Sequence, residues 1–287
     1  MGYVRSNAYD WETRTSTYAT RSTGDIFKNQ EAKPEYLPKN ITIREARRSD
    51  VNPNPTPIML IADVTGSMGY LAKEVVTKLP DIIKRINEAM IVSDPQIAIG
   101  AVGDIETDSY PLQITQFESG IALCDQAENL YIEGGGGGNH FESYDAPWLF
   151  AATKVVADLD ERKGYIFTIG DEPPPPDNVN SNRYIDCFGN DALVMKPSQS
   201  FAEASKQFNV FHLIIENGGY CKVRPEKVIP AWRELIGNNA ILVNDVAALS
   251  DIIIAIISIN EGILSIDDAI KHSIYSTSVK NAFRLID

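Results

Sequence analysis

The sequence predicts an α/β protein with a mostly parallel sheet, helices on both faces and one antiparallel edge strand. Two observations lead to this fold class. First, between residues 57 and 262, short continuous apolar segments alternate with amphipathic segments of helical period. Continuous apolar strands are typical of parallel sheets, because helices cover both faces of such a sheet. Second, several apolar segments end on an acidic residue, as strands do at the ligand-binding edge of a doubly wound, Rossmann-like sheet.

The predicted elements follow one another in regular order. Strands are expected over 58–63, 96–103, 112–117, 165–169, 209–215 and 240–243, of which 112–117 is the edge strand. Helices are expected over 69–90, 121–130, 143–162, 198–208, 225–236 and 246–260. The helix over 143–162 is predicted from a stripe of apolar residues that includes Val155, Val156 and Leu159.

Three segments differ in composition and define the predicted domains. Residues 1–56 form an N-terminal arm with nine basic and seven acidic residues, a net charge of +2, whereas the remainder of the chain carries −15. Such an arm is expected to fold back on the acidic body or to dock on a neighbouring subunit and form a homo-oligomer. Within it, 13–20 and 41–45 have the composition of short strands. Residues 57–262 form the main domain, and 263–287 a helical appendage.

Charge and cysteine content limit which partners and which cellular compartment are expected for the 287-residue chain. Its formal net charge of −13 disfavours nucleic acid and the anionic surface of a membrane as partners. The three cysteines are scattered, which favours a reducing compartment. No apolar secretory region is visible near Met1, and the most apolar run, 252–259, is too short to cross a bilayer. The expected location is the cytoplasm, or a virion if the gene belongs to a phage.

The most informative stretch is the end of the first strand of the main domain. Asp63, Thr65 and Ser67 occupy alternate positions between that strand and the next helix. One carboxylate and two hydroxyls can therefore converge, and hard oxygen donors suit Mg²⁺, with Mn²⁺ or Ca²⁺ as alternatives, better than zinc. The competing interpretation is a Ser/Thr helix cap in which Asp63 only accepts hydrogen bonds from backbone amides.

Two further loops bring oxygen donors to the same predicted edge of the sheet. A run of five glycines, 134–138, precedes Asn139 and Glu142, and Asp171 follows the strand over 165–169. Glycines let the backbone approach a ligand closely and adopt positive φ. The carboxyl ends of parallel strands meet at one edge of a sheet, so these loops are expected to surround a common point.

The segment from Asp63 to Met68 resembles the first loop of the metal-ion-dependent adhesion site (MIDAS) of von Willebrand factor A-type (vWA) domains, in particular those of intracellular bacterial or phage proteins. Thr65 stands where Ser is usual and keeps the hydroxyl. The resemblance implies a vWA fold over 57–262. The metal ligands that it implies are Asp63, Thr65, Ser67, Asn139 and Asp171. It also places Asp104 and Glu142 behind these ligands, where they would orient them.

The function implied by this resemblance is non-enzymatic. The ion would bind an acidic residue of a protein partner inside a larger assembly, with an AAA+ ATPase or virion proteins as candidate partners. Two alternatives remain open. One is a structural virion or assembly protein with a vestigial metal site. The other is phosphoryl transfer through Asp63, since the same loop also resembles the nucleophile loop of haloacid-dehalogenase-type proteins. No P-loop and no GxSxG motif occurs in the sequence.

Overall fold

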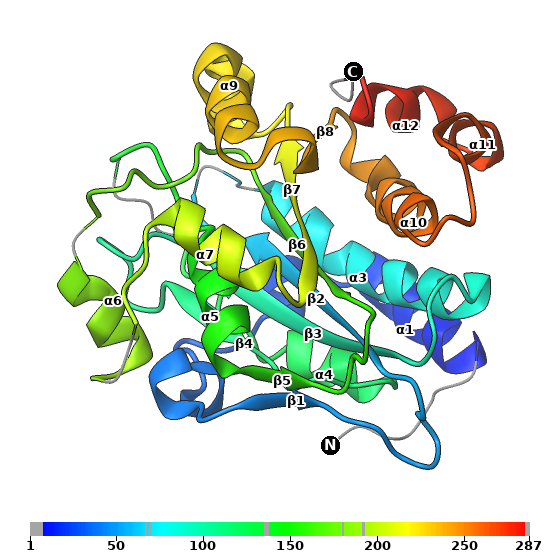
Figure 1. Cartoon of the computed structure of the whole chain (residues 1–287), viewed down its shortest axis with the longest axis horizontal. Coiled ribbons are helices and arrows are strands. Elements are labelled where there is room, and N and C mark those ends of the chain that lie inside the picture. The colour runs from blue at the N-terminus through cyan, green and yellow to red at the C-terminus, as the bar shows by residue number, and fades with distance from the viewer. Residues whose placement is uncertain are drawn as a thin grey trace.

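The computed structural model describes residues 8–66, 68, 70–134, 138–179, 181–190 and 193–284. At its centre is a six-stranded sheet in the order β4-β3-β2-β6-β7-β8 (Figure 1). The strands are β2 (Thr56–Asp63), β3 (Pro95–Val102), β4 (Leu112–Ile114), β6 (Gly164–Gly170), β7 (Phe208–Ile215) and β8 (Ala240–Val243). All neighbouring pairs are parallel except β3 and β4. The predicted α/β class, with a mostly parallel sheet and an antiparallel edge strand, is confirmed.

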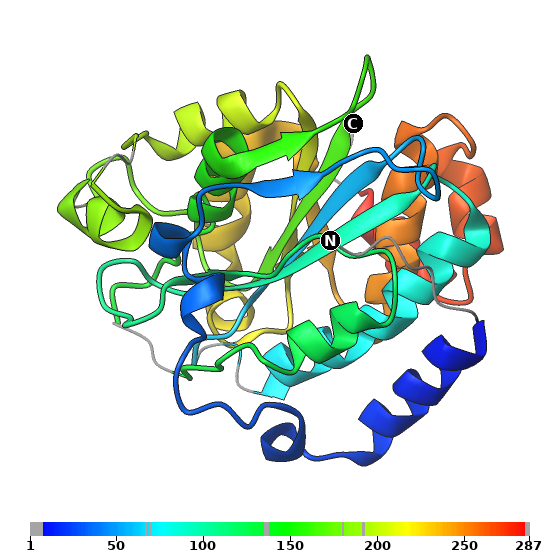
Figure 2. The ribbon, with the colours of Figure 1, turned by 90° about the horizontal axis from the view of Figure 1, so that it is seen from below.

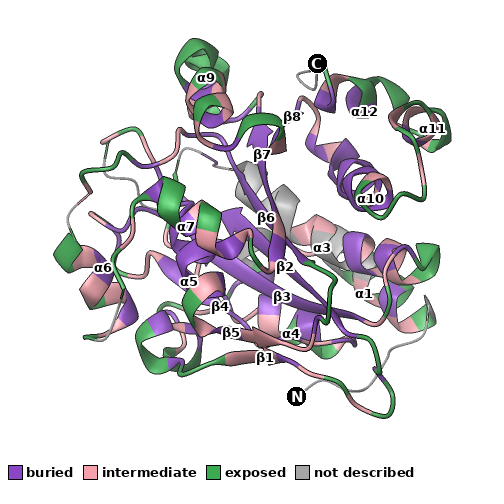
Figure 3. Cartoon of the chain, in the orientation of Figure 1, coloured by how far each residue is buried: buried purple, intermediate pink, exposed green. Residues whose placement is uncertain are grey.

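The central strand β2 explains why a continuous apolar run forms a strand here. All eight of its residues are buried, because helices cover both faces of the sheet. Its side chains alternate between two cores: Ile58 and Leu60 belong to one, and Met59 and Ile61 to the other. Figure 3 shows the strands of the six-stranded sheet as mostly buried, while the outer surfaces of the helices are exposed.

Helices form a layer on each side of the sheet. Those that contribute to the core with Leu60 are α1 (Ala8–Thr20), α3 (Tyr70–Ala89), α4 (Ala122–Ala127), α10 (Leu249–Asn260), α11 (Ile266–His272) and α12 (Ser276–Ala282). Those that contribute to the core with Ile61 are α5 (Ala146–Lys154), α6 (Ser181–Phe188), α7 (Pro197–Ala204) and α9 (Pro225–Ile236). Short helices or turns lie at Thr23–Ile26 (α2), Gly219–Val223 (α8), Pro34–Tyr36, Pro38–Asn40, Gly237–Asn239 and Val246–Ala248.

Two local predictions are wrong. The helix expected over 143–162 ends at Lys154, and the next three residues form strand β5 (Val155–Ala157), which pairs in parallel with β1 (Arg44–Ala46). Consecutive β-branched valines favour a strand once a partner is available, and that partner comes from the distant arm. The strand expected over 13–20 is instead part of helix α1.

The N-terminal arm packs on the body of its own chain. Figure 2 shows α1 lying along the outside of α3. Trp11 of α1 is only 2% exposed, and Arg14 donates hydrogen bonds to the carboxylates of Asp125 (2.7 Å) and Glu128 (3.0 Å) beside α4. At the other end of the chain, α11 and α12 pack against α10. Among the helices of the described residues, none combines the length and apolar character needed to span a membrane.

Asp145, which immediately precedes α5, makes the stability of the fold depend on pH. It is fully buried, and Tyr184 Oη donates to both of its oxygens (2.9 and 2.8 Å). Burial outweighs these bonds and raises the pKa of Asp145 to about 7. The protonated form is thus favoured in the folded state. Its stabilising contribution is complete below the unfolded-state pKa of about 4 and is lost as the pH rises through about 7.

Asp145→Asn is therefore expected to reduce the decline in stability between about pH 4 and pH 7, since asparagine does not titrate. Urea unfolding of wild type and variant across this range measures the difference. Asp177→Asn, at an exposed acidic residue, serves as the control. Equal pH slopes for wild type and Asp145→Asn would show that Asp145 stays ionised in the folded protein.

Candidate metal centre

The candidate site lies at the carboxyl edge of the sheet, where three strands end on acidic residues. Asp63 is the last residue of β2, Asp104 follows β3, and Asp171 follows β6. All three side chains are fully buried. The chain runs outward from β2 to β3 on one side and returns to β6 on the other, so β2 and β6 flank the point where the strand order reverses. Ligands bind at this point in open α/β sheets.

Both oxygens of Asp63 accept short hydrogen bonds. Oδ1 accepts bonds from the backbone N–H (2.8 Å) and the hydroxyl (2.6 Å) of Thr65, two residues along the chain. Oδ2 accepts a bond from the hydroxyl of Tyr144 (2.6 Å). The loop thus brings Asp63 and Thr65 together as the alternate spacing predicts. It also contains the backbone bond expected of the cap interpretation. Ser67, the third predicted donor of this loop, lies outside the described residues.

Asp171 approaches the same point from β6. Its Oδ2 accepts a hydrogen bond from the backbone N–H of Tyr220 (2.6 Å), which anchors α8 to the site. Gly218 makes this approach possible, because a Cβ at that position would lie 2.5 Å from the Asp171 Cβ. Burial raises the pKa of Asp63, and the negative charge of Asp171 raises it further. The two carboxylates therefore lie close enough to repel each other in a water-poor environment.

The loop after the glycine run carries two candidate oxygen donors for a metal, Asn139 and Glu142, and their side chains have different surroundings. The side-chain amide of Asn139 donates to Asp104 Oδ2 (2.8 Å), which already accepts a bond from the hydroxyl of Thr107 (2.6 Å). Glu142 is 2% exposed, and its Oε2 has no hydrogen-bond partner among the described residues. Burial raises the pKa of Glu142, and Asp63 is the neighbouring charge that adds most to this increase. Glu142, which was expected behind the ligands, is thus close enough to Asp63 for the two charges to influence each other.

The glycine run itself is described only at its ends. Residues 135–137 lie outside the described residues. Gly134 and Gly138 adopt φ values of 64° and 70°, the left-handed conformation that glycine permits without strain. His140 adopts the same conformation with φ of 63°, which is uncommon for a residue with a side chain.

Tyr144 is a component of the site that sequence reasoning missed. Its ring is fully buried, with its centroid 4.6 Å from that of His212 and 5.4 Å from that of Trp232. A Cβ at Gly170 would overlap the Tyr144 hydroxyl, so glycine at the end of β6 leaves the space in which that hydroxyl reaches Asp63. Nothing in the sequence marks this tyrosine, because the contact joins residues on separate strands and loops.

The chemistry of the donor set suits a hard divalent cation, although its placement in this structure forms no complete metal cluster among the described residues. The oxygen donors come from loops that interact with one another, and they are the carboxylates of Asp63, Asp171 and Glu142 and the hydroxyl of Thr65. Glu142 Oε2 is a buried oxygen without a hydrogen-bond partner among the described residues. Oxygen donors of this kind are the usual ligands of Mg²⁺, and a cation would offset the repulsion between the acids. A search of the described residues for groups of three or more His, Cys, Asp or Glu side chains placed to hold a metal ion finds none.

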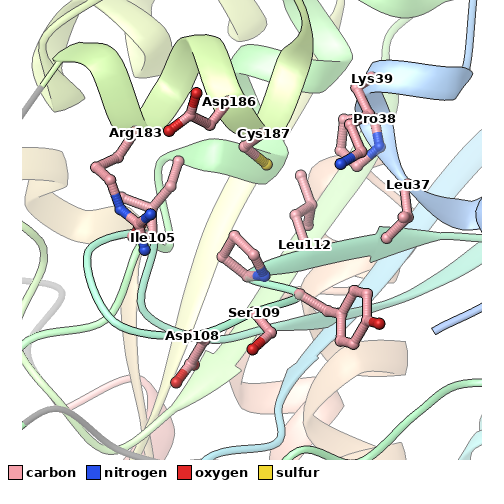
Figure 4. A pocket seen from close by; sticks show the side chains of 12 residues that line it. Leu37, Pro38, Lys39, Ile105, Asp108, Ser109, Leu112, Arg183, Asp186 and Cys187 are labelled. Atoms are coloured by element: carbon pink, nitrogen blue, oxygen red, sulfur yellow. The ribbon is translucent and has the colours of Figure 1, made fainter. Parts of the chain in front are cut away.

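A separate pocket of about 120 Å³ lies between α6, the loop after β3 and the arm (Figure 4). Cys187 of α6 faces Pro38 and Lys39 of the arm across it. Burial raises the pKa of the Cys187 thiol to about 12, so the thiol is protonated and unreactive near neutral pH. The pocket is too small for more than a few water molecules and holds no activated nucleophile.

Known proteins match this chain in structure but not in sequence family. No protein-family model and no curated protein matches the sequence. Among solved structures, the chain is similar to the open conformation of the pilus adhesin SpaC from Lactobacillus rhamnosus GG, with 13% identity and a TM-score of 0.46 over 79% of this chain and 31% of the adhesin. It is also similar to proximal thread matrix protein 1 from the mussel byssus, with 10% identity and a TM-score of 0.47 over 73% of this chain and 48% of that protein. The chain thus spans about a third and about half of these two proteins, and similarity at this level assigns no function.

Proposed function

We propose that residues 57–262 form a vWA-type domain whose strand-end site binds Mg²⁺ and, through the ion, an acidic side chain of a protein partner. The domain would act as a non-enzymatic binding module within a larger assembly. Asp63, Thr65, Asp171 and Glu142 would hold the ion, together with Ser67, and Asn139 would act through its bond to Asp104. The ion supplies positive charge and an open coordination position for the partner's carboxylate.

One observation carries this proposal: the buried acids Asp63 and Asp171 end the two strands that flank the reversal of strand order, and buried Glu142 Oε2 has no hydrogen-bond partner among the described residues. Burying several carboxylates together is unfavourable unless protons or a cation neutralise them, and Mg²⁺ would take the place of the protons that the raised pKa values of Asp63 and Glu142 favour. The placement of β4 as an antiparallel edge strand next to β3 agrees with the fold that the vWA resemblance implies.

The alternatives receive less support from the geometry. A nucleophilic aspartate needs an oxygen that can reach a phosphorus atom. Asp63 is fully buried, and each of its oxygens accepts a short hydrogen bond. For assembly through the N-terminal arm the structure gives mixed indications: Trp11, Ile26 and Phe27 are covered by the same chain, whereas Tyr9, Ile43 and Val51 are exposed. The main competing hypothesis is a metal-free scaffold protein, and the response to added Mg²⁺ distinguishes it from the proposed function.

Mg²⁺ is expected to stabilise the protein, because it binds the folded acids and not the dispersed acids of the unfolded chain. At about ten times its dissociation constant, a ligand adds about 1.4 kcal/mol, which corresponds to a rise in Tm of about 2–3 °C for a chain of this size. Thermal melts in EDTA and in Mg²⁺, Mn²⁺ or Ca²⁺ at constant ionic strength measure the shift. Identical melting temperatures under all of these conditions would favour the metal-free scaffold.

Tyr144→Phe tests the hydroxyl that holds Asp63. The variant keeps the ring and removes one hydrogen bond to a carboxylate, so it is expected to lose about 1–3 kcal/mol of stability and about tenfold in Mg²⁺ affinity. Tyr184→Phe is the matched control, because it removes an equivalent bond to buried Asp145 in a different part of the structure. The control is expected to lose stability and keep its Mg²⁺ response. An equal loss of Mg²⁺ affinity in both variants would contradict the role given to Tyr144.

A further inference from the structure

A pocket of about 430 Å³ adjoins the candidate metal centre. The residues that form it include His140, Glu172, Tyr220, Val223, Arg224 and Lys227. It is joined to the site by two links: Glu172 follows Asp171 in the chain, and the backbone N–H of Tyr220 donates to Asp171 Oδ2. A molecule held at Asp171 would therefore lie beside the mouth of this pocket.

The walls of the pocket are aromatic and apolar. The rings of His140 and Tyr220 stack with centroids 5.0 Å apart and planes 18° apart, so the loop after the glycine run and α8 meet at this wall. Val223, at the end of α8, is 71% exposed. Together with the Tyr220 ring, it gives the pocket an apolar surface that an apolar group of a ligand could cover. The unusual left-handed backbone of His140 is the conformation in which the structure presents its ring to this wall.

The rim of the pocket is basic, although the chain as a whole carries −13. Arg224 and Lys227 are exposed there, and exposed Lys222 lies nearby on α8. Arg224 is paired with Glu226 (2.7 Å). The one acidic residue of the lining, Glu172, is 8% exposed and lies deeper than the cations. Positive charge at the edge and apolar surface inside favour a partner with acidic groups outside and an apolar group inserted.

We propose that this pocket recognises the residues that flank, in the partner's sequence, the acidic residue bound to the metal ion. The occupant is an acidic–aromatic segment of another protein. One of its carboxylates reaches the ion, an aromatic or large aliphatic side chain enters between Tyr220 and Val223, and a second carboxylate pairs with Lys227. This inference rests on the proposed metal-dependent function. It adds a statement of which residues the partner carries beside its acid, because the ion alone would bind an acidic side chain whatever residues flank it.

A phage-displayed library of heptapeptides with a fixed central aspartate tests the proposal. It is selected on the whole chain in Mg²⁺ and, in parallel, in EDTA. Wild type is expected to enrich peptides that carry an aromatic or large aliphatic residue and a second acid within three positions of the fixed aspartate. Lys227→Glu is expected to lower the enrichment of the second acid about fivefold and to favour Lys or Arg in its place. Val223→Asp is expected to remove the preference for the apolar residue.

The outcomes separate this inference from the function on which it rests. Both substitutions lie at exposed positions, so the variants should keep the wild-type Mg²⁺ shift in melting temperature. Enrichment that needs Mg²⁺ but is the same in wild type and both variants would overturn the pocket and leave the metal-bridged function standing. Enrichment that persists in EDTA and responds to both variants would support the pocket and overturn metal bridging. The absence of any enrichment around the aspartate would overturn the pocket.

Discussion

Asp63→Asn is expected to raise the free energy of unfolding in EDTA by about 1–2 kcal/mol at pH 8 and to abolish the stabilisation by Mg²⁺. The physical reason is the repulsion between the fully buried carboxylates of Asp63 and Asp171, which the substitution removes. Asparagine keeps a side-chain oxygen that can accept the bonds from Thr65, and its amide N–H can donate to the Tyr144 hydroxyl, which reverses the direction of that bond instead of removing it. Urea unfolding and thermal melts, each with EDTA and with Mg²⁺, measure both effects.

Asp104→Asn is the matched control for this experiment. Asp104 is also a fully buried acid after a strand, but its carboxylate accepts hydrogen bonds from Asn139, Thr107 and the backbone N–H of Glu106. The control should therefore lose about 1–3 kcal/mol in EDTA, opposite in sign to Asp63→Asn, and keep a weakened Mg²⁺ response, because Asp104 acts on the site only through Asn139. If Asp63→Asn instead loses stability in EDTA and wild type shows no Mg²⁺ shift, then Asp63 serves as a backbone cap and the metal site does not exist.

Trp232→Ala is expected to lose about 3–5 kcal/mol of stability and to weaken Mg²⁺ binding as well. Trp232 is fully buried in α9, and its ring stacks on His212 with centroids 3.6 Å apart. It also packs against Tyr144, which holds Asp63, and its indole N–H donates to the carbonyl of Glu172 (2.9 Å). Removing the ring would leave a cavity behind the site and free the loop that follows Asp171.

Trp232→Phe separates packing from the hydrogen bond. It keeps an aromatic ring beside His212 and Tyr144 but cannot donate to Glu172, so we expect a loss of about 1–2 kcal/mol and a smaller change in Mg²⁺ affinity. Chemical unfolding and Mg²⁺ titrations of the three proteins compare the two contributions. A Trp232→Ala variant with wild-type Mg²⁺ affinity would show that the site does not depend on this support.

The candidate site could be predicted in part. The alternation of Asp63 and Thr65 at a strand end is a local pattern, and the structure brings these two side chains into direct contact. The same reasoning placed Asp171 at the same edge, because parallel strands end together. The same reasoning could not predict which acids Asn139 and Glu142 lie near. Both follow a glycine run, and only the packing around Asp104 and Asp63 decides which acid each of them lies near.

The sequence by itself determined the α/β class and the buried strands of the sheet, since continuous apolar runs such as 58–62 can be buried on both faces only inside such a sheet. Tertiary structure alone decided three features: the pairing of Val155–Ala157 with Arg44–Ala46, the docking of α1 on α3, and the contact of Tyr144 with Asp63. Each of these joins segments far apart in the chain. Local periodicity records which face of a segment is apolar, but it carries no information about which distant segment will cover that face.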